Sequence, residues 1–192
     1  MHDLIKPIET KYKGYSFRSR LEARWAVFFE ELGIKYLYEH EGYDLTEINK
    51  DPAFFVDGDS GPRLRPDETW YLPDFYLPDY KWYFEIKPNK EAVTDGALDK
   101  CILLSTEHHI GIITGSPWAD EYIVTAIFSP REAMHGWFAE GRKCDRLWLV
   151  NIAGDSVGLD CNECWSPKCK GSQTWIDRGL EKAYDAAKAA RF

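Results

Sequence analysis

Apolar positions between residues 19 and 32 recur at intervals of three and four, which is the spacing of one face of an α-helix. Gly33 suits the residue that follows a helix end, because glycine readily adopts positive φ. The pattern therefore predicts a helix at 19–32, followed by a strand at 35–39. The apolar stripe of this helix consists of Leu21, Trp25, Phe28, Phe29 and Leu32.

Two aromatic and apolar segments, residues 70–77 and 81–86, lie on either side of a Leu-Pro-Asp-Tyr sequence that is typical of a turn. We expect them to form an antiparallel hairpin. Side chains alternate between the two faces of a strand, so Glu85 and Lys87 should project together, away from the apolar residues beside them.

The remaining pattern predicts an α/β protein with the element order helix, strand, strand, strand, helix, strand. We expect a core domain at 1–135 and a smaller segment at 136–192. His108 and His109 should lie at the end of the second helix, where the helix dipole favours them. The further predicted elements are a long loop or insertion at about 42–69, a helix at 91–107, strands at 110–115 and 122–128, and a C-terminal helix at 176–192.

Composition indicates a folded chain that can bury a sizeable core as one domain with a small addition. Its 192 residues are 44% hydrophobic and include 8 Trp, 11 Tyr and 10 Phe. No apolar run is long enough to cross a bilayer, and the first residues do not resemble a signal peptide. We therefore expect no membrane partner and a cytoplasmic location.

The formal net charge of −8 bears on any nucleic-acid partner. Proteins that bind phosphates usually carry positive charge, so this acidity argues against a tight, non-specific duplex binder. It is compatible with an enzyme that contacts few phosphates and holds metal ions among its carboxylates.

Asp74, Glu85 and Lys87 are candidates for catalysis, because the hairpin would bring two carboxylates and one ammonium together. Close carboxylates repel each other unless a cation joins them, and their hard oxygen atoms suit Mg²⁺. The chemistry implied is metal-assisted hydrolysis with a lysine beside the attacking water. The alternative is structural: carboxylates beside a turn and an exposed ion pair on an edge strand that ends at Pro88.

Glu22 also has two interpretations. Ser19 and Glu22 have the spacing of a capping box, in which Glu22 only satisfies backbone N–H groups. Glu22 also lies at the edge of the apolar stripe, where a half-buried carboxylate needs a partner such as a metal site. Both roles can coexist at a helix start.

Four cysteines in the C-terminal third have the spacing of a zinc site. Cys144, Cys161, Cys164 and Cys169 lie among polar residues, and four thiolates satisfy tetrahedral Zn²⁺. We expect one structural zinc, with His135 or a carboxylate as the alternative to Cys144. Cys101 stands in an apolar run and is expected in the core.

The core motifs resemble those of a known family. Pro73-Asp74, followed by Glu85-Ile86-Lys87, is similar to the signature of the PD-(D/E)XK nuclease superfamily. The preceding helix with Arg-Ser-Arg-Leu-Glu-Ala-Arg-Trp-Ala, then Leu-Gly-Ile and a strand, resembles the opening of small phage or mobile-element endonucleases. The resemblance covers about residues 12–115.

This resemblance implies a restriction-endonuclease-like fold and Mg²⁺- or Mn²⁺-dependent hydrolysis of DNA phosphodiester bonds in a bacterial host cell. It implies that Asp74, Glu85 and the backbone carbonyl of Ile86 hold the metal. Lys87 would orient or deprotonate the attacking water or hold phosphate oxygens, and Glu22 would bind metal directly or through water. Candidates for DNA contacts are Arg18, Arg20 and Arg24.

A rival function belongs to a different class: a nucleic-acid-binding or protein-binding module with a zinc ribbon and an inactive nuclease-like scaffold. Metal binding discriminates between the two, because a catalytic site should bind Mn²⁺ or Mg²⁺ measurably. The sequence leaves open the DNA structure that is cleaved and the oligomeric state, a homodimer included.

Overall fold

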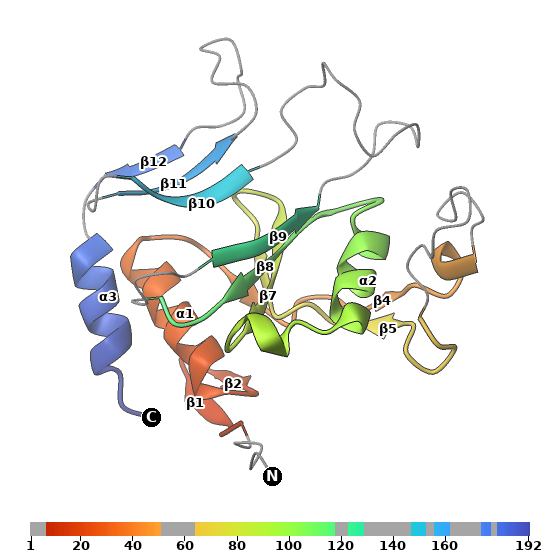
Figure 1. The fold of residues 1–192 in the computed structure, drawn as a ribbon. Helices are drawn as coiled ribbons and strands as arrows, with labels where there is room; N and C mark the ends of the chain where they lie inside the picture. Colours follow the sequence, from red (N-terminus) through yellow and green to blue (C-terminus); the bar gives the residue numbers. More distant parts are fainter. Residues whose placement is uncertain are drawn as a thin grey trace.

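The computed structural model describes the backbone of residues 7–50, 64–117, 123–128, 147–152, 156–161, 174–177 and 180–192. Side chains are described for residues 7–50, 64–117 and 182–192. Within these residues the chain is a mixed α/β protein, with helices on both faces of a mixed sheet (Figure 1). None of the described helices is long and apolar enough to span a membrane.

The central sheet has five strands. Neighbouring strands are antiparallel except β7 and β8, which are parallel. Parallel neighbours need a crossover connection, and the helix α2 (Asp95–Leu104) supplies it. In spatial order the strands are β3 (Leu37–Tyr38), β6 (Phe75–Leu77), β7 (Trp82–Lys87), β8 (His109–Thr114) and β9 (Ile123–Phe128).

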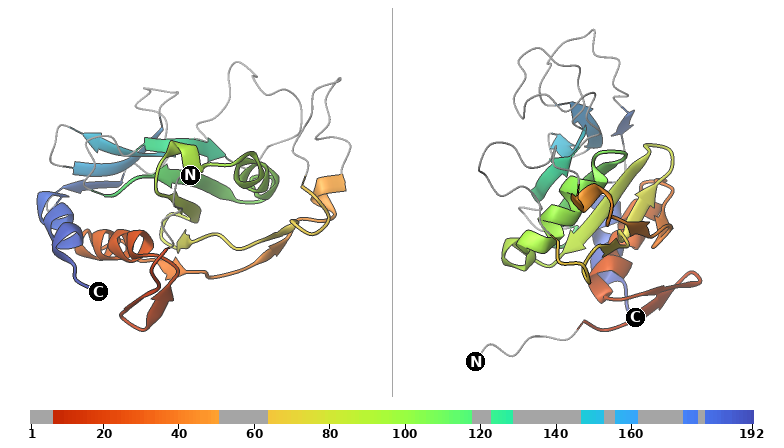
Figure 2. Two further views of the ribbon diagram at one scale, coloured as in Figure 1. Left: turned by 60° about the horizontal axis from the view of Figure 1, so that its bottom comes forward. Right: turned by 90° about the vertical axis from the view of Figure 1, so that its right-hand side faces the viewer.

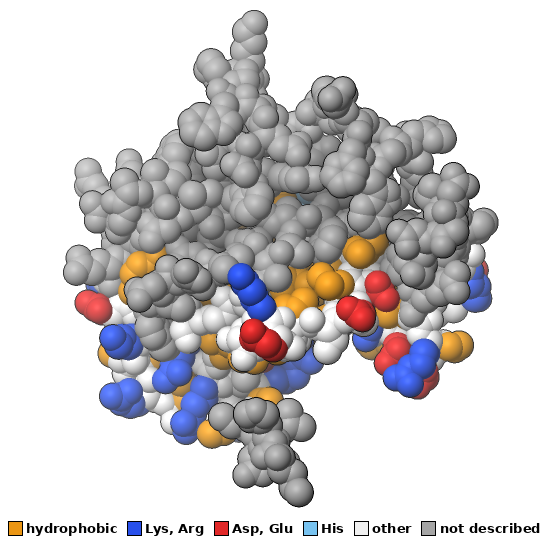
Figure 3. Space-filling model, in the orientation of Figure 1, with side chains coloured by type: hydrophobic (Ala, Val, Ile, Leu, Met, Phe, Trp, Pro, Cys, Tyr) orange, Lys and Arg blue, Asp and Glu red, His pale blue; other side chains and the backbone are white. Residues whose placement is uncertain are grey.

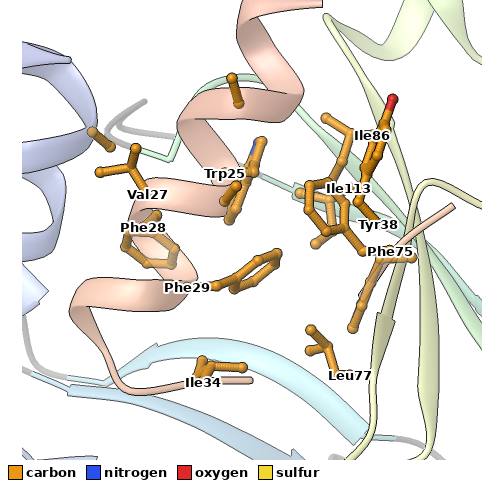
Figure 4. Packing of buried hydrophobic residues seen from close by; sticks show 14 of the residues in the cluster. Trp25, Val27, Phe28, Phe29, Ile34, Tyr38, Phe75, Leu77, Ile86 and Ile113 are labelled. Atoms are coloured by element: carbon orange, nitrogen blue, oxygen red, sulfur yellow. The ribbon is translucent and has the colours of Figure 1, made fainter. Parts of the chain in front are cut away.

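The first helix, α1 (Arg20–Glu31), covers one face of this sheet. Its N-cap is Ser19, and Gly33 follows its end with a φ of +70°, a conformation that favours glycine. Figure 4 shows Phe29 pointing from α1 toward Phe75 and Leu77 of the sheet. The helix predicted from the apolar stripe is confirmed, because the side chains of the stripe either lie in the core cluster or, for Leu21, pack against it.

The helix α2 packs on the opposite face, where it forms a second core cluster with residues of β7 and β8. Thr94 caps its start, since the threonine hydroxyl accepts a hydrogen bond from the N–H of Ala97. A short 3₁₀ turn, η3 (Lys90–Ala92), precedes it. Figure 2 shows the sheet between α1 and α2.

Smaller elements surround the central sheet. Two short antiparallel pairs are formed by β1 (Thr10–Tyr12) with β2 (Tyr15–Phe17), and by β4 (Tyr43–Asp44) with β5 (Trp70–Tyr71). A 3₁₀ turn, η1, spans Ile48–Lys50. A separate three-stranded antiparallel sheet consists of β10 (Leu147–Ile152), β11 (Ser156–Cys161) and β12 (Thr174–Asp177).

The C-terminal helix α3 (Leu180–Ala189) packs along α1 rather than standing apart from the core. Tyr184 stacks on Phe28 with ring centroids 5.4 Å apart, and Lys182 pairs with Glu31 at 2.7 Å. Ala183 belongs to the same buried cluster as the α1 side chains. The expected boundary between residues 135 and 136 lies outside the described residues and stays a prediction.

Three details of the sequence-based elements were wrong. The single strand expected at 70–77 is divided into β5 and β6, because the chain leaves the extended ladder at Pro73 and Asp74. The C-terminal helix begins at Leu180, and the residues before it form β12, which pairs with β11. His109 lies at the start of β8 and stacks on Trp82, so it is not a helix-end residue.

Candidate functional site

Asp74 directly precedes the first residue of β6. Beyond the end of the backbone ladder between β6 and β7, its side-chain carboxylate bonds to β7. The ladder between these strands runs from Phe75, opposite Phe84, away from Asp74. Asp74 Oδ2 instead accepts a hydrogen bond from the backbone N–H of Ile86, at 2.7 Å. Asp74 is only 2% exposed, so this bond fixes a buried carboxylate beside the strand that carries Glu85.

Glu85 and Lys87 project from the same face of β7, as the strand period predicted. Lys87 Nζ donates to Glu85 Oε1 at 2.6 Å, and the other oxygen, Glu85 Oε2, accepts from the hydroxyl of Tyr71 at 3.1 Å. The intervening Ile86 belongs to the opposite, apolar face. The prediction that the Glu85 carboxylate and the Lys87 ammonium lie together on one face of the strand is therefore confirmed.

Glu22 both caps α1 and belongs to the electrostatic surroundings of Asp74. Its backbone N–H donates to Ser19 Oγ at 3.2 Å, and the Ser19 hydroxyl donates to Glu22 Oε1 at 2.7 Å. Glu22 Oε2 accepts from the hydroxyl of Tyr38 at 2.5 Å and from the N–H of Arg18 at 3.0 Å. The capping box is thus present, with the N–H of Arg18 in place of that of Ser19.

Burial and neighbouring negative charge raise the pKa of Asp74 well above its usual range. Burial is the largest cause, and the carboxylates of Glu85 and Glu22 follow. The N–H of Ile86 and the guanidinium of Arg18 act in the opposite direction. The three carboxylates therefore influence one another, although they belong to three separate segments of the chain.

Lys87 is held in its charged form by the same surroundings. Burial alone would lower the pKa of its ammonium, but the negative charge of Glu85 and the hydrogen bond to it outweigh burial, so the pKa is raised. The cluster contains the carboxylates of Glu22, Asp74 and Glu85 but only two cations, those of Arg18 and Lys87. This excess of negative charge would stabilise a further cation.

Arg18 contacts two carboxylates, an interaction that the sequence did not suggest. Its Nη2 donates to Asp74 Oδ1 at 2.5 Å, and its Nε lies 2.8 Å from Glu39 Oε1, so the guanidinium bridges two carboxylates of the site. Arg20 is exposed at the first residue of α1, and Arg24 is half-buried. The three arginines expected to contact DNA therefore differ in their surroundings, and their DNA contacts stay a prediction.

Sequence reasoning missed the residues that hold the carboxylates. Tyr38 on β3 and Tyr71 on β5 each donate to a buried carboxylate, and Tyr71 also lies 3.3 Å from the sulfur of Cys101. A buried tyrosine hydroxyl needs a polar partner, which is the only signal in the sequence that could have suggested these roles. Which partner each tyrosine would find depends on contacts between distant segments.

The chemistry of the donor set fits a hard divalent cation, because carboxylate oxygens are the ligands that Mg²⁺ and Mn²⁺ prefer. Among the described residues, however, no group of three or more His, Cys, Asp or Glu side chains is arranged to hold a metal ion. Asp74 Oδ1 and Glu85 Oε1 are instead engaged by Arg18 and Lys87. Metal binding by Asp74, Glu85 and the carbonyl of Ile86 stays a prediction.

The expected zinc ligands mostly lie outside the described residues. Cys144, Cys164, Cys169 and the alternative ligand His135 are not described, and Cys161 is described only in its backbone, as the last residue of β11. Cys101 is a residue of α2 and is fully buried in the core cluster that this helix forms with the sheet, as predicted.

Comparisons of the chain with protein-family models, with curated proteins and with solved structures found no match. The proposals that follow therefore depend on the residues of the site and on the motif resemblance alone.

Proposed function

We propose that this protein is a metal-dependent DNA endonuclease of the PD-(D/E)XK type, which hydrolyses phosphodiester bonds with Mg²⁺ or Mn²⁺. The observation that carries the proposal is the bond from the N–H of Ile86 to Asp74 Oδ2. It fixes the Asp of the motif beside the strand that presents the Glu and the Lys. The resemblance to this superfamily supplies DNA as the substrate.

Each candidate residue of the site has a role in this proposed reaction. Asp74, Glu85 and the carbonyl of Ile86 would hold the metal, which would supply a lowered pKa for a bound water and positive charge for the phosphate. Lys87 donates from its ammonium to the attacking water or to a phosphate oxygen. Glu22 adds negative charge from the start of α1 and strengthens the hold on the cation.

Basic side chains for a polyanionic substrate are present despite the net acidity. On the face shown in Figure 3, Lys and Arg side chains gather over α3 and the adjoining part of α1. Arg20, exposed at the start of α1, is a candidate for a phosphate contact. The local positive charge is compatible with an enzyme that contacts a limited number of phosphates.

The test is an assay of the purified full chain against duplex, single-stranded and branched DNA, with Mg²⁺ and with Mn²⁺. Asp74→Ala, Glu85→Ala and Lys87→Ala should each abolish metal-dependent cleavage. Arg65→Met, which removes an exposed ion pair with Glu68, is the matched control and should cleave like wild type. Normal cleavage by a folded Lys87→Ala variant would refute the assigned mechanism.

The rival function is an inactive nuclease-like module that binds nucleic acid or protein. The observation that favours it is that Arg18 and Lys87 already neutralise two of the buried carboxylates without a metal. Such a module need not bind Mn²⁺, whereas the endonuclease must. Failure of wild type both to bind Mn²⁺ and to cleave any substrate would favour the module.

For the C-terminal third we propose one structural Zn²⁺ held by Cys144, Cys161, Cys164 and Cys169. Elemental analysis should find about one zinc per chain, as a closed four-thiolate site requires. Protein purified without chelators and free of zinc would contradict this proposal. Zinc that survives Cys144→Ser but not Cys164→Ser would identify His135 or a carboxylate as the fourth ligand.

A further inference from the structure

Arg18 is an exposed cation that contacts the buried carboxylate of Asp74. The Asp74 side chain is 3% exposed, whereas that of Arg18 is 55% exposed, so the guanidinium lies on the solvent side of the carboxylate. Asp74 Oδ2 is engaged by the N–H of Ile86, which leaves Oδ1 as the oxygen not tied to the backbone. Arg18 occupies Oδ1.

We propose that Arg18 is a resident counter-cation that competes with the divalent metal for Asp74 Oδ1 and is released when the metal binds. This inference rests on the proposed function and concerns how its metal site is loaded. Among the described residues no group of three or more such side chains is arranged to hold a metal. In this arrangement Asp74 Oδ1 and Glu85 Oε1 are engaged by Arg18 and Lys87 instead.

The surroundings of Arg18 allow its side chain to leave Asp74 without losing its place in the fold. Its backbone N–H is held by Glu22 Oε2 and by the hydroxyl of Tyr38, both at 3.0 Å, so the residue stays fixed at the start of α1. Its Nε retains Glu39, whose side chain is 27% exposed, as a second partner. The released Nη atoms then face solvent as donors for a phosphate oxygen.

The proposal assigns Arg18 two successive roles. Before loading it neutralises a buried carboxylate, which would otherwise be unpaired beside Glu22 and Glu85. After loading its guanidinium is available to the substrate at a site where the metal is already in place. Metal binding and phosphate binding are thereby linked through one side chain.

The first measurement is the affinity of Mn²⁺ itself, followed by the electron paramagnetic resonance of free Mn²⁺ in titrations of the full chain. Arg18→Met keeps the aliphatic stem and removes the competitor. A charge-assisted hydrogen bond is worth roughly tenfold or more in an equilibrium, so we expect Mn²⁺ to bind about tenfold more tightly. The matched control is Arg65→Met, which makes the same change in the exposed pair with Glu68 and should bind like wild type.

Arg18→Met could strengthen metal binding in two ways: it removes a direct competitor at Asp74 Oδ1, and it removes long-range repulsion between the guanidinium and the metal ion. Salt distinguishes these two effects. Long-range attraction is screened as the Debye length falls from about 10 Å at 0.1 M salt to about 3 Å at 1 M, whereas a direct contact is screened much less. Tighter binding by Arg18→Met should therefore persist at high KCl. Disappearance of the difference at high KCl would overturn the competition.

The second measurement uses wild-type protein and does not depend on how the variant folds. The Nε–Hε nuclear magnetic resonance signal of Arg18, assigned by its loss in Arg18→Met or Arg18→Lys, should shift during Mg²⁺ titration and saturate with the metal. The signal of Arg65 should stay unchanged. An Arg18 signal that does not respond while Mg²⁺ binds would overturn the inference.

The outcomes separate this inference from the proposed function. If wild type binds no Mn²⁺ and cleaves no DNA, the endonuclease proposal fails, and the role of Arg18 fails with it. If wild type binds Mn²⁺ but Arg18→Met binds it equally or more weakly, only the competition fails, because Arg18 then supports the metal site or is neutral toward it.

Discussion

Replacing Glu22 by Gln separates the capping role of this residue from its charge. Glutamine can keep a partner for each described group: its Oε1 can accept from the hydroxyl of Tyr38 and the N–H of Arg18, and its Nε2 can donate to Ser19 Oγ, which reverses the bond that the Ser19 hydroxyl donates to Glu22. Gln also serves in capping boxes. The substitution therefore changes one negative charge and little else.

The expected effect of Glu22→Gln is small on the stability of the metal-free protein and large on metal affinity and cleavage. At an effective dielectric of about 20, two unit charges roughly 8 Å apart repel by about 2 kcal/mol, so removal of the charge of Glu22 should not destabilise the metal-free fold. Loss of a carboxylate close to a metal typically weakens metal affinity by about 10- to 100-fold. We expect an unchanged or slightly higher Tm in chelator, together with weak Mn²⁺ binding and severely reduced cleavage.

Two further variants make the result interpretable. Glu30→Gln removes a charge from the other end of α1, where Glu30 accepts from Tyr12 and pairs with Lys13, and should leave Mn²⁺ binding unchanged. Glu22→Ala removes the acceptor of the buried Tyr38 hydroxyl and should lower the free energy of unfolding by about 1–3 kcal/mol. If Glu22→Gln binds Mn²⁺ and cleaves like wild type, this residue is purely structural.

Further predictions concern the supports of the site and the core. Tyr71→Phe removes the donor to Glu85 Oε2 and should weaken Mn²⁺ binding by about tenfold in titrations; an unchanged affinity would show that Tyr71 does not position Glu85. Phe28→Ala removes a fully buried ring that stacks on Tyr184 and should lower the free energy of unfolding by about 3–5 kcal/mol in urea melts; a loss below about 1 kcal/mol would contradict docking of α3 on α1. Burial raises the pKa of the Cys101 thiol, so peptide mapping should find it alkylated only after unfolding, and rapid labelling in the native state would contradict its burial.

Local patterns predicted the parts of the fold that depend on local periodicity. The three-and-four spacing of α1 and the alternation along β7 each place a side chain on a definite face, and the described contacts agree with both. The division of the strand at 70–77 was missed because aromatic residues continue on both sides of Pro73, so the apolar pattern carries no sign of the break. The start of α3 was missed because an alanine-rich helix follows directly on a segment whose pairing with β11 is non-local.

The candidate site was predictable in its motif residues but not in their partners. The same-face placement of Glu85 and Lys87 follows from strand geometry. The bond between Arg18 and Asp74 joins residues 56 positions apart, and no spacing rule predicts it. Such contacts depend on how α1 packs on the sheet. The apolar stripe predicts that α1 packs there, but it does not fix the position of the helix to the accuracy of a hydrogen bond.

The charge of the buried carboxylates is only partly explained by the ion pairs that Arg18 and Lys87 form with them. The described bonds to Glu22 need oxygen acceptors, which an amide side chain supplies as well, and the N–H of Ile86 needs one oxygen from residue 74. Buried like charges oppose folding, as the raised pKa of Asp74 records. Proteins tolerate features that oppose folding, such as buried like charges, mainly at functional sites. Arg18 and Lys87 match the charges of Asp74 and Glu85, whereas the bonds to Glu22 need oxygen acceptors and no negative charge. The divalent cation that we propose would give this remaining charge a function, and Glu22→Gln tests it.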